Sequence, residues 1–146
     1  MHVKELNSID EMLSFYHVIS ELYPKMTIKE YKAKLIEMTP HNYKQAAVFD
    51  SQNKCIGISG FWIGNKLWCG KYMELDNIII IQGNRSSGAG SILFEYLKEK
   101  ALKIGCNIMT LDSYSTNFKA HKFFYNKEFA PKGFHFVSVL NESGIR

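Results

Sequence analysis

One stretch decides the fold: Ile78-Ile79-Ile80-Ile81-Gln82-Gly83-Asn84-Arg85-Ser86-Ser87-Gly88-Ala89-Gly90. Its four consecutive isoleucines predict a strand that is buried on both faces. Gly88 and Gly90 lack a Cβ atom, so a ligand can approach the backbone closely at these positions. An amphipathic helix follows, and its first N–H groups and the positive end of its dipole favour an anion such as phosphate. The stretch therefore predicts a strand, a phosphate-binding turn and a helix in direct succession.

The composition limits the classes of protein to consider. The chain has 146 residues, enough for one domain, 1–146, and a formal net charge of +4. Its Lys and Arg residues are spread along the chain, so we expect neither a nucleic-acid nor a membrane partner. The polar segment 1–10 does not resemble a signal peptide, and no apolar run approaches the roughly 18 residues of a transmembrane helix. Because Cys55, Cys69 and Cys106 lack metal-ligand spacing, we interpret them as reduced thiols and expect a cytoplasmic protein without a metal.

The rest of the chain alternates helical and strand patterns around this stretch. Two capping boxes, Ser8-x-x-Glu11 and Thr27-x-x-Glu30, predict two helices, the first ending near Tyr23. The expected elements are strand 1–6, helices 9–23 and 28–38, strands 43–49, 55–63 and 67–81 with a turn at 64–65, helix 90–104, strand 107–111, helix 117–127 and strand 134–140. This order, βααβββαβαβ, predicts an α/β (α+β) fold whose mixed, mostly antiparallel sheet is flanked by helices.

The turn differs from two familiar phosphate-binding patterns. A P-loop requires Gly-Lys-Ser/Thr, whereas Gly90-Ser91 lacks the lysine. A Rossmann fingerprint requires three glycines and an acidic residue about 20 positions later. Asp112 meets the second requirement, but the third glycine is absent. The strands before the turn also form a meander and not βαβ repeats.

A third pattern fits the turn. Arg85-x-x-Gly88-x-Gly90, which follows a strand and opens a helix, resembles the acyl-CoA-binding loop of the GNAT superfamily of N-acetyltransferases. Downstream, Asn117-x-x-Ala120, followed by an aromatic pair and by Phe129, resembles the next helix of that superfamily. The order of elements also matches over nearly the whole chain. The resemblance implies a GNAT-like fold and an acetyl-CoA-dependent N-acetyltransferase.

The resemblance also implies how acetyl-CoA would bind. The pantetheine arm would lie beside Ile78, Ile79 and Ile80 and pair with their backbone, and an N–H near Ile80 would polarise the thioester carbonyl. Asn117 would bond the arm from the other side. Arg85 is either a fork donor to a CoA phosphate or a solvated turn residue. The pyrophosphate would sit on the backbone N–H groups of Ser86, Ser87, Gly88, Ala89, Gly90 and Ser91.

Acyl transfer to an amine needs a base, because only the neutral amine attacks. Strand alternation predicts that Glu74, Asp76, Ile78 and Ile80 share one face. Glu74 matches in position the catalytic glutamate of superfamily members that act on protein lysines. Asp112 matches the base of members that act on protein N-termini, and Asp76 is a third candidate.

The acid that would protonate the leaving thiolate is where the sequence departs from the superfamily. Phe124 occupies the position of the usual tyrosine, and Tyr125 follows it. One helical position rotates a side chain by roughly 100°, so Tyr125 is a candidate acid beside Tyr114 or no protein acid at all. Glu128 replaces the glycine that usually precedes the last phenylalanine.

We therefore expect an N-acetyltransferase that moves an acetyl group from acetyl-CoA to a primary amine by direct attack in a ternary complex. The acceptor is a small molecule or a protein amine, and no acidic cluster selects between them. A non-catalytic GNAT-fold module that binds acyl-CoA is the main alternative, which Phe124 keeps open. A nucleotide-binding domain that uses the same turn is a more remote one. The resemblance also makes a homodimer an option.

Overall fold

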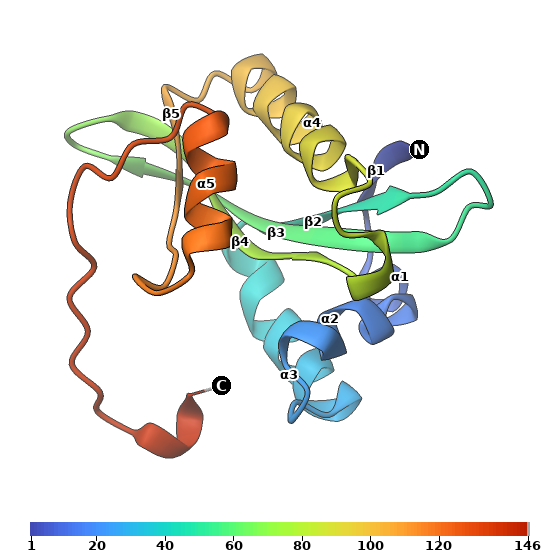
Figure 1. The fold of residues 1–146 in the computed structure, drawn as a ribbon. Coiled ribbons are helices and arrows are strands. Elements are labelled where there is room, and N and C mark those ends of the chain that lie inside the picture. Colours follow the sequence, from blue (N-terminus) through green and yellow to red (C-terminus); the bar gives the residue numbers. More distant parts are fainter. Residues whose placement is uncertain (146) are drawn as a thin grey trace. The chain divides into compact units, whose positions relative to one another are not determined.

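The computed structural model describes residues 1–145 and contains two compact units, which are described separately. The first unit is residues 1–110, and the second begins at Leu111. Figure 1 shows the elements along the chain. Those that begin in the first unit are β1 (His2–Leu6), α1 (Ile9–Ser14), α2 (Tyr16–Leu22), α3 (Ile28–Met38), η1 (Thr39–His41), β2 (Tyr43–Phe49), β3 (Cys55–Lys66), β4 (Gly70–Ile80), η2 (Gln82–Asn84), α4 (Ala89–Lys103) and β5 (Ile108–Leu111).

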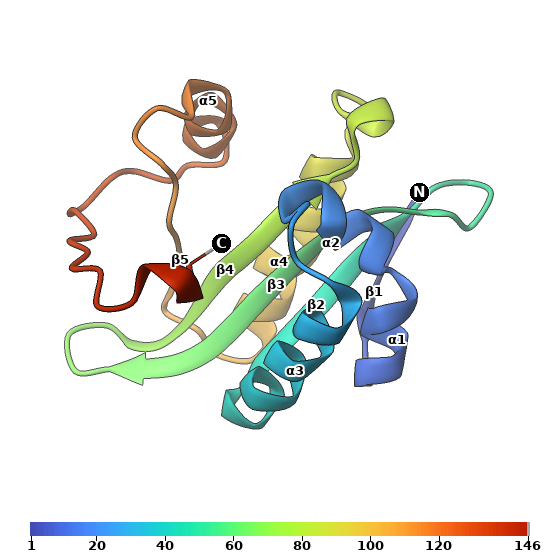
Figure 2. The ribbon, with the colours of Figure 1, turned by 90° about the horizontal axis from the view of Figure 1, so that it is seen from below.

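The five strands form one sheet in the order β1-β2-β3-β4-β5. β1, β2, β3 and β4 pair antiparallel with their neighbours, as a meander joined by short turns must. Helix α4 covers one face of this sheet, and α1, α2 and α3 cover the other (Figures 1 and 2). This arrangement confirms the expected mixed α/β fold with a mostly antiparallel sheet between helices.

The core of the first unit lies on both sides of β2, β3 and β4. Apolar side chains of the inner strands meet those of α2 and α3 on one face and those of α4 on the other. This is the burial that stabilises a sheet covered on both faces. The largest side chains that are almost fully buried are Phe61, Ile19, Leu35, Ile56, Ile58, Met73, Leu93 and Leu97.

The first expected helix is in fact two helices. α1 ends at Ser14 and α2 begins at Tyr16, and Phe15 between them leaves the helical region with φ −109° and ψ 21°. The Phe15 ring packs edge-on against Phe49 of β2, with ring centroids 5.4 Å apart. The break therefore lets an aromatic side chain reach the sheet.

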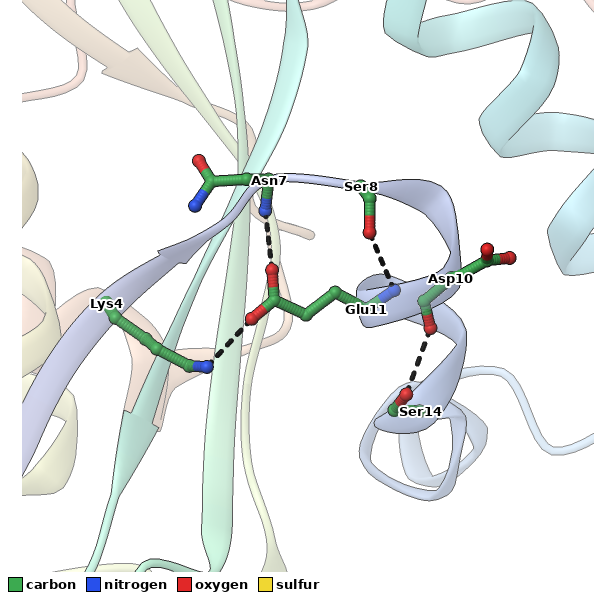
Figure 3. A network of polar contacts seen from close by, with 6 residues as sticks. All are labelled: Lys4, Asn7, Ser8, Asp10, Glu11 and Ser14. Carbon is green, nitrogen blue, oxygen red and sulfur yellow. Dashed lines mark hydrogen bonds and ion pairs between the residues drawn. The ribbon is translucent and has the colours of Figure 1, made fainter.

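The first capping box closes in an unexpected way (Figure 3). Ser8 Oγ accepts the N–H of Glu11 at 3.1 Å, as a cap should. The Glu11 carboxylate instead accepts the N–H of Asn7 at 2.8 Å and the Nζ of Lys4 at 2.7 Å. It thus ties the start of α1 to β1. The second box, at the start of α3, is complete.

The turn predicted at 64–65 is wrong. β3 runs on to Lys66, and the chain turns at 67–69 before β4 begins. Gly64 has another role, because Tyr72 of β4 lies directly across from it. A Cβ at Gly64 would lie 2.7 Å from the Tyr72 hydroxyl, so the glycine makes room for the ring.

The second unit contains α5 (Phe118–Asn126) and η3 (Glu142–Gly144). The Asn117 side chain caps α5 by accepting the N–H of Ala120 at 3.3 Å. The rings of Phe123 and Phe129 both pack edge-on against Phe124, with centroids 5.7 and 6.1 Å away. The helix predicted at 117–127 is therefore confirmed.

The strand predicted at 134–140 is wrong. These residues lie in no helix or strand, although they are rich in the aromatic and β-branched residues that favour strands. Phe134, Phe136, Val137, Val139 and Leu140 are all exposed. Such a composition favours a strand but does not supply a neighbouring strand to pair with.

Candidate functional site

The turn between β4 and α4 has the backbone geometry of an anion site. Ser86 and Gly88 both adopt left-handed conformations, with φ 68° and 87°. Gly88 is the N-cap of α4 and offers no side chain to the helix end. A Cβ at Gly88 would meet nothing within 4 Å, so the space in front of the helix is open. Only glycine combines this backbone with this access.

Unpaired N–H groups at the start of α4 supply the chemistry. Ala89 donates to Ser87 Oγ at 3.3 Å, and Ile92 donates to the Gly88 carbonyl at 3.1 Å. Within residues 1–145, no acceptor is present for the N–H groups of Gly90 and Ser91. No acidic residue lies in the first turn of α4. The residues therefore fit the pyrophosphate of a nucleotide or of CoA.

Arg85 binds the end of the strand that precedes the turn. Its Nε donates to the Ile80 carbonyl at 3.2 Å, and the side chain remains exposed. The residue thus fixes the turn against β4 and is more than a solvated side chain. A guanidinium has five N–H donors, so this bond leaves others for a phosphate.

β4 carries a bulge where the isoleucine run begins. The register with β3 is regular as far as the pair Gly60–Asp76, and it resumes with one extra residue on β4. Asn77 and Ile78 together lie opposite Ser59. Asn77 has φ 52°, a left-handed conformation that asparagine tolerates better than most residues. Such a bulge twists the strand and turns its later residues.

The bulge changes which side chains share a face. Directly opposed residues of an antiparallel pair share a face, so Asp76 opposite Gly60 and Ile79 opposite Ile58 point the same way. Ile80, the next residue, points to the opposite face. The prediction that Ile80 shares a face with the carboxylates of β4 is therefore wrong, because the extra residue shifts the alternation.

The isoleucine run is only partly buried. Ile79 and Ile81 are buried, whereas Ile78 and Ile80 are half-buried. The prediction of a strand buried on both faces is thus wrong for two of the four residues. The residues Ile78 and Ile80 are thus not sealed from solvent, unlike Ile79 and Ile81.

The three candidate carboxylates differ in what they bind. Both oxygens of Asp76 accept hydrogen bonds, from the Asn77 N–H at 2.8 Å and from Trp62 Nε1 at 3.1 Å. Asp112, in the second unit, lies 2.7 Å from Nδ1 of His135. The half-buried Glu74 lies opposite Trp62, and its carboxylate has no partner among residues 1–145. Of the three candidates, Glu74 is therefore the uncommitted proton acceptor.

Three aromatic residues of the first unit differ in their exposure and contacts. Tyr31 is buried and bonds Gln45, so it belongs to the core. Trp68 is 74% exposed in the β3–β4 turn. Trp62 is half-buried and packs against Tyr43, with ring centroids 4.9 Å apart. Only Trp62 therefore combines exposure with a place beside the β4 carboxylates.

Two features of the site lie beyond the sequence predictions. The first is the bulge, and the second is a network of buried hydroxyl and amide groups that bonds Asn77. An asparagine within a strand pattern was the available signal, since asparagine is disfavoured in regular strands. Gly57 and Gly60 in the facing strand were a second signal, because glycine there marks close packing.

Residues 1–145 contain neither a candidate metal site nor a helix that could span a membrane. Within residues 1–145, no three His, Cys, Asp or Glu side chains gather where they could hold a metal ion. In the same residues, every helix is too short or too polar to cross a membrane.

Comparison with known protein families decides the family. The model of the Acetyltransferase (GNAT) family matches residues 8–129, which are most of the chain. The chain belongs to the GNAT acetyltransferase family. The match includes the turn and α4, and it confirms the resemblance seen in the sequence.

Individual relatives agree with this family. The uncharacterized N-acetyltransferase YhdJ of Bacillus subtilis is 26% identical over 129 residues, which cover 87% of this chain and 89% of the relative. A putative acetyltransferase from Agrobacterium tumefaciens aligns with a TM-score of 0.80 at 15% identity, covering 95% of this chain and 99% of that one. Glucosamine-6-phosphate N-acetyltransferase from Arabidopsis thaliana aligns with a TM-score of 0.72 at 18% identity, covering 95% and 97%. At these identities the solved structures show a shared GNAT fold.

The departures from the GNAT pattern lie on α5 and just after it. Phe124 packs against other phenylalanines of its own unit, whereas Tyr125 is 57% exposed and Tyr114 is 81% exposed. Glu128 adopts φ 66°, which explains why a glycine is usual at this position. Asn117 uses Oδ1 as the α5 cap, which leaves Nδ2 to donate to a ligand.

Proposed function

We propose that this GNAT protein transfers an acetyl group from acetyl-CoA to a primary amine. One observation supports the donor above all others: the open, unpaired N–H groups at the start of α4, behind Gly88 and beside Arg85. The pyrophosphate of CoA would bind there, in the turn from Ser86 to Ser91, on the N–H groups that have no acceptor within residues 1–145, those of Gly90 and Ser91 among them. The N–H groups of Ser87 and Ala89 already bond Asn84 and Ser87 in this structure. The backbone of Ile78 and Ile80, two half-buried residues, would pair with the pantetheine arm.

The proposed reaction is a direct attack within a ternary complex. The amine nitrogen bonds to the thioester carbonyl carbon, the carbon–sulfur bond breaks, and CoA leaves as the thiolate. The proton lost by the amine passes to Glu74, directly or through one water molecule. A backbone N–H near Ile80 donates to the carbonyl oxygen as its charge grows. Tyr125 or solvent protonates the thiolate.

Several further parts of the proposal rest on separate observations. Asn117 Nδ2 would donate to the pantetheine arm. The three cysteines are free thiols, which supports a cytoplasmic location. The exposed apolar segment 134–140 supports a homodimer, and a monomer mass in light scattering would refute it.

The test is turnover on a panel of amines. Purified protein with acetyl-CoA is supplied with polyamines, amino acids, aminoglycosides and lysine peptides, and release of the CoA thiol is measured. Release that depends on one class of amine supports the transferase and names its acceptor class. Acetyl-CoA binding without release on any amine would instead support the non-catalytic module that Phe124 keeps open.

A further inference from the structure

A chain of hydrogen bonds runs from the buried core to the β4 bulge. The Tyr43 hydroxyl donates to Asn77 Oδ1 at 2.7 Å, and Asn77 Nδ2 donates to the Tyr23 hydroxyl at 2.9 Å. Gln45 Nε2 bonds both the Tyr43 hydroxyl, at 3.0 Å, and the Tyr31 hydroxyl, at 2.8 Å. The chain joins α3, β2, the residue after α2 and the bulge, all within the first unit.

The inner groups of this chain are removed from water and satisfied by one another, whereas Asn77 and Tyr23 are part-buried. Tyr43 is 3% exposed and Gln45 is fully buried. Burial raises the pKa of Tyr43 well above its usual range and that of Tyr31 to about 12, so both phenols stay protonated and can donate. A buried polar atom that loses its partner is costly, so the network favours one arrangement of the groups that it joins.

The end of α2 holds the isoleucine run on both sides. Tyr23, the residue that follows α2, receives the Asn77 amide before the run. Glu21 Oε2 accepts the N–H of Gln82 at 3.0 Å immediately after it. Figure 2 shows α2 beside this end of β4. Residues 78–81 are thus fixed at both ends to one helix.

We propose that Tyr43 and Asn77 are positioning residues that fix the bulge, and with it the direction of the backbone N–H groups of Ile78, Ile79 and Ile80. The inference rests on the proposed function, in which those N–H groups meet the pantetheine arm and the thioester carbonyl. Asn77 supplies the left-handed backbone and Tyr43 holds its side chain. The same bonds connect the backbone that would meet the thioester to Tyr23, the residue after α2.

Close packing around Tyr43 gives an independent way to disturb the network. A Cβ at Gly60 would lie 2.3 Å from the Tyr43 hydroxyl. Gly60→Ala must therefore displace the phenol from Asn77 while every hydroxyl and amide remains in the protein. Tyr43→Phe removes the same bond by deleting one oxygen atom and leaves the ring in place.

The experiment compares Tyr43→Phe and Gly60→Ala with Tyr31→Phe. Tyr31→Phe is the matched control, because it also removes a buried hydroxyl bonded to Gln45 but does not contact Asn77. Amide hydrogen exchange over residues 77–80 is measured on the protein without ligand. The kcat value and the KM values for acetyl-CoA and for the amine are then measured by thiol release. Asn77→Asp, which keeps an acceptor for Tyr43, serves as the conservative variant, and Asn77→Gly keeps only the backbone freedom.

We expect faster exchange over residues 77–80 and a kcat on the order of tenfold lower in Tyr43→Phe, Gly60→Ala and Asn77→Gly. Tyr31→Phe should stay within about twofold of the wild type. Asn77→Asp, which keeps the acceptor for Tyr43 but loses the donor to Tyr23, should lose less kcat than Asn77→Gly. Unchanged exchange in Tyr43→Phe, or an equal loss of kcat in Tyr31→Phe, would overturn the inference. If the wild type shows no acyl-CoA binding and no turnover, the proposed function fails, and the exchange data alone decide whether Tyr43 fixes the bulge.

Discussion

Glu74 differs from the other carboxylates because it is half-buried and has no partner within residues 1–145. Both oxygens of Asp76 accept hydrogen bonds, one from the Asn77 N–H and one from Trp62, and Asp112 lies against His135. A general base must be free to take a proton, so the contacts favour Glu74. The sequence alone left these three open, since spacing gives a residue's place in a strand but not the hydrogen bonds that its side chain makes.

We predict that Glu74→Gln lowers kcat/KM for the amine by about 100-fold or more, because this is the usual contribution of a general base. Thiol release at a fixed pH is the measurement. Glu37→Gln, a change of an exposed carboxylate on α3, is the control and should have no effect. A small loss in Glu74→Gln combined with a large one in Asp112→Asn would assign the base to Asp112.

Among the elements, helix starts were predictable because their signals are local. Ser8, Thr27 and Gly88 each mark a helix start within one residue. The bulge at Asn77 was not predictable, because it depends on Tyr43 and Tyr23, which are distant in sequence. The prediction of a strand at 134–140 was wrong for a related reason. A strand must pair with a neighbouring strand, and the local sequence does not indicate which strand that is.

The contact between α1 and β1 gives a pH-dependent prediction. The Lys4 ammonium and the Asn7 N–H lower the pKa of the Glu11 carboxyl. A lowered pKa stabilises the fold above the ordinary glutamate pKa, and this stability is lost as the pH falls through the lowered value. We expect Glu11→Gln to reduce the free energy of unfolding by about 0.5–1 kcal/mol at pH 7.

Urea denaturation of the wild type and Glu11→Gln at neutral and acidic pH checks this prediction. The difference between them should shrink once the wild-type carboxyl is protonated. Glu37→Gln, whose carboxylate has no partner among residues 1–145, should show no such pH dependence. A Glu11→Gln difference that is the same at both pH values would contradict the role of the charge.

For the whole molecule, the family match spans residues 8–129, which are most of the first unit and the beginning of the second. The turn, Glu74 and the isoleucine run lie in the first unit, and Asp112, Asn117 and Tyr125 lie in the second. The turn from Arg85 to Ser91, where we propose that the pyrophosphate of CoA binds, therefore belongs to the first unit by itself.

A calorimetric titration with acetyl-CoA, CoA and ATP tests directly whether this turn binds the pyrophosphate of CoA. Gly88→Glu places a carboxylate where the pyrophosphate would bind. Gly105→Glu is its matched control, because Gly105 also has a left-handed φ, of 79°, and open space around it, but it lies at the other end of α4. We predict micromolar binding of acetyl-CoA and CoA by the wild type and Gly105→Glu, a loss of more than about 100-fold in Gly88→Glu, and no binding of ATP. Normal acetyl-CoA affinity in folded Gly88→Glu, or no CoA binding by the wild type, would contradict the account.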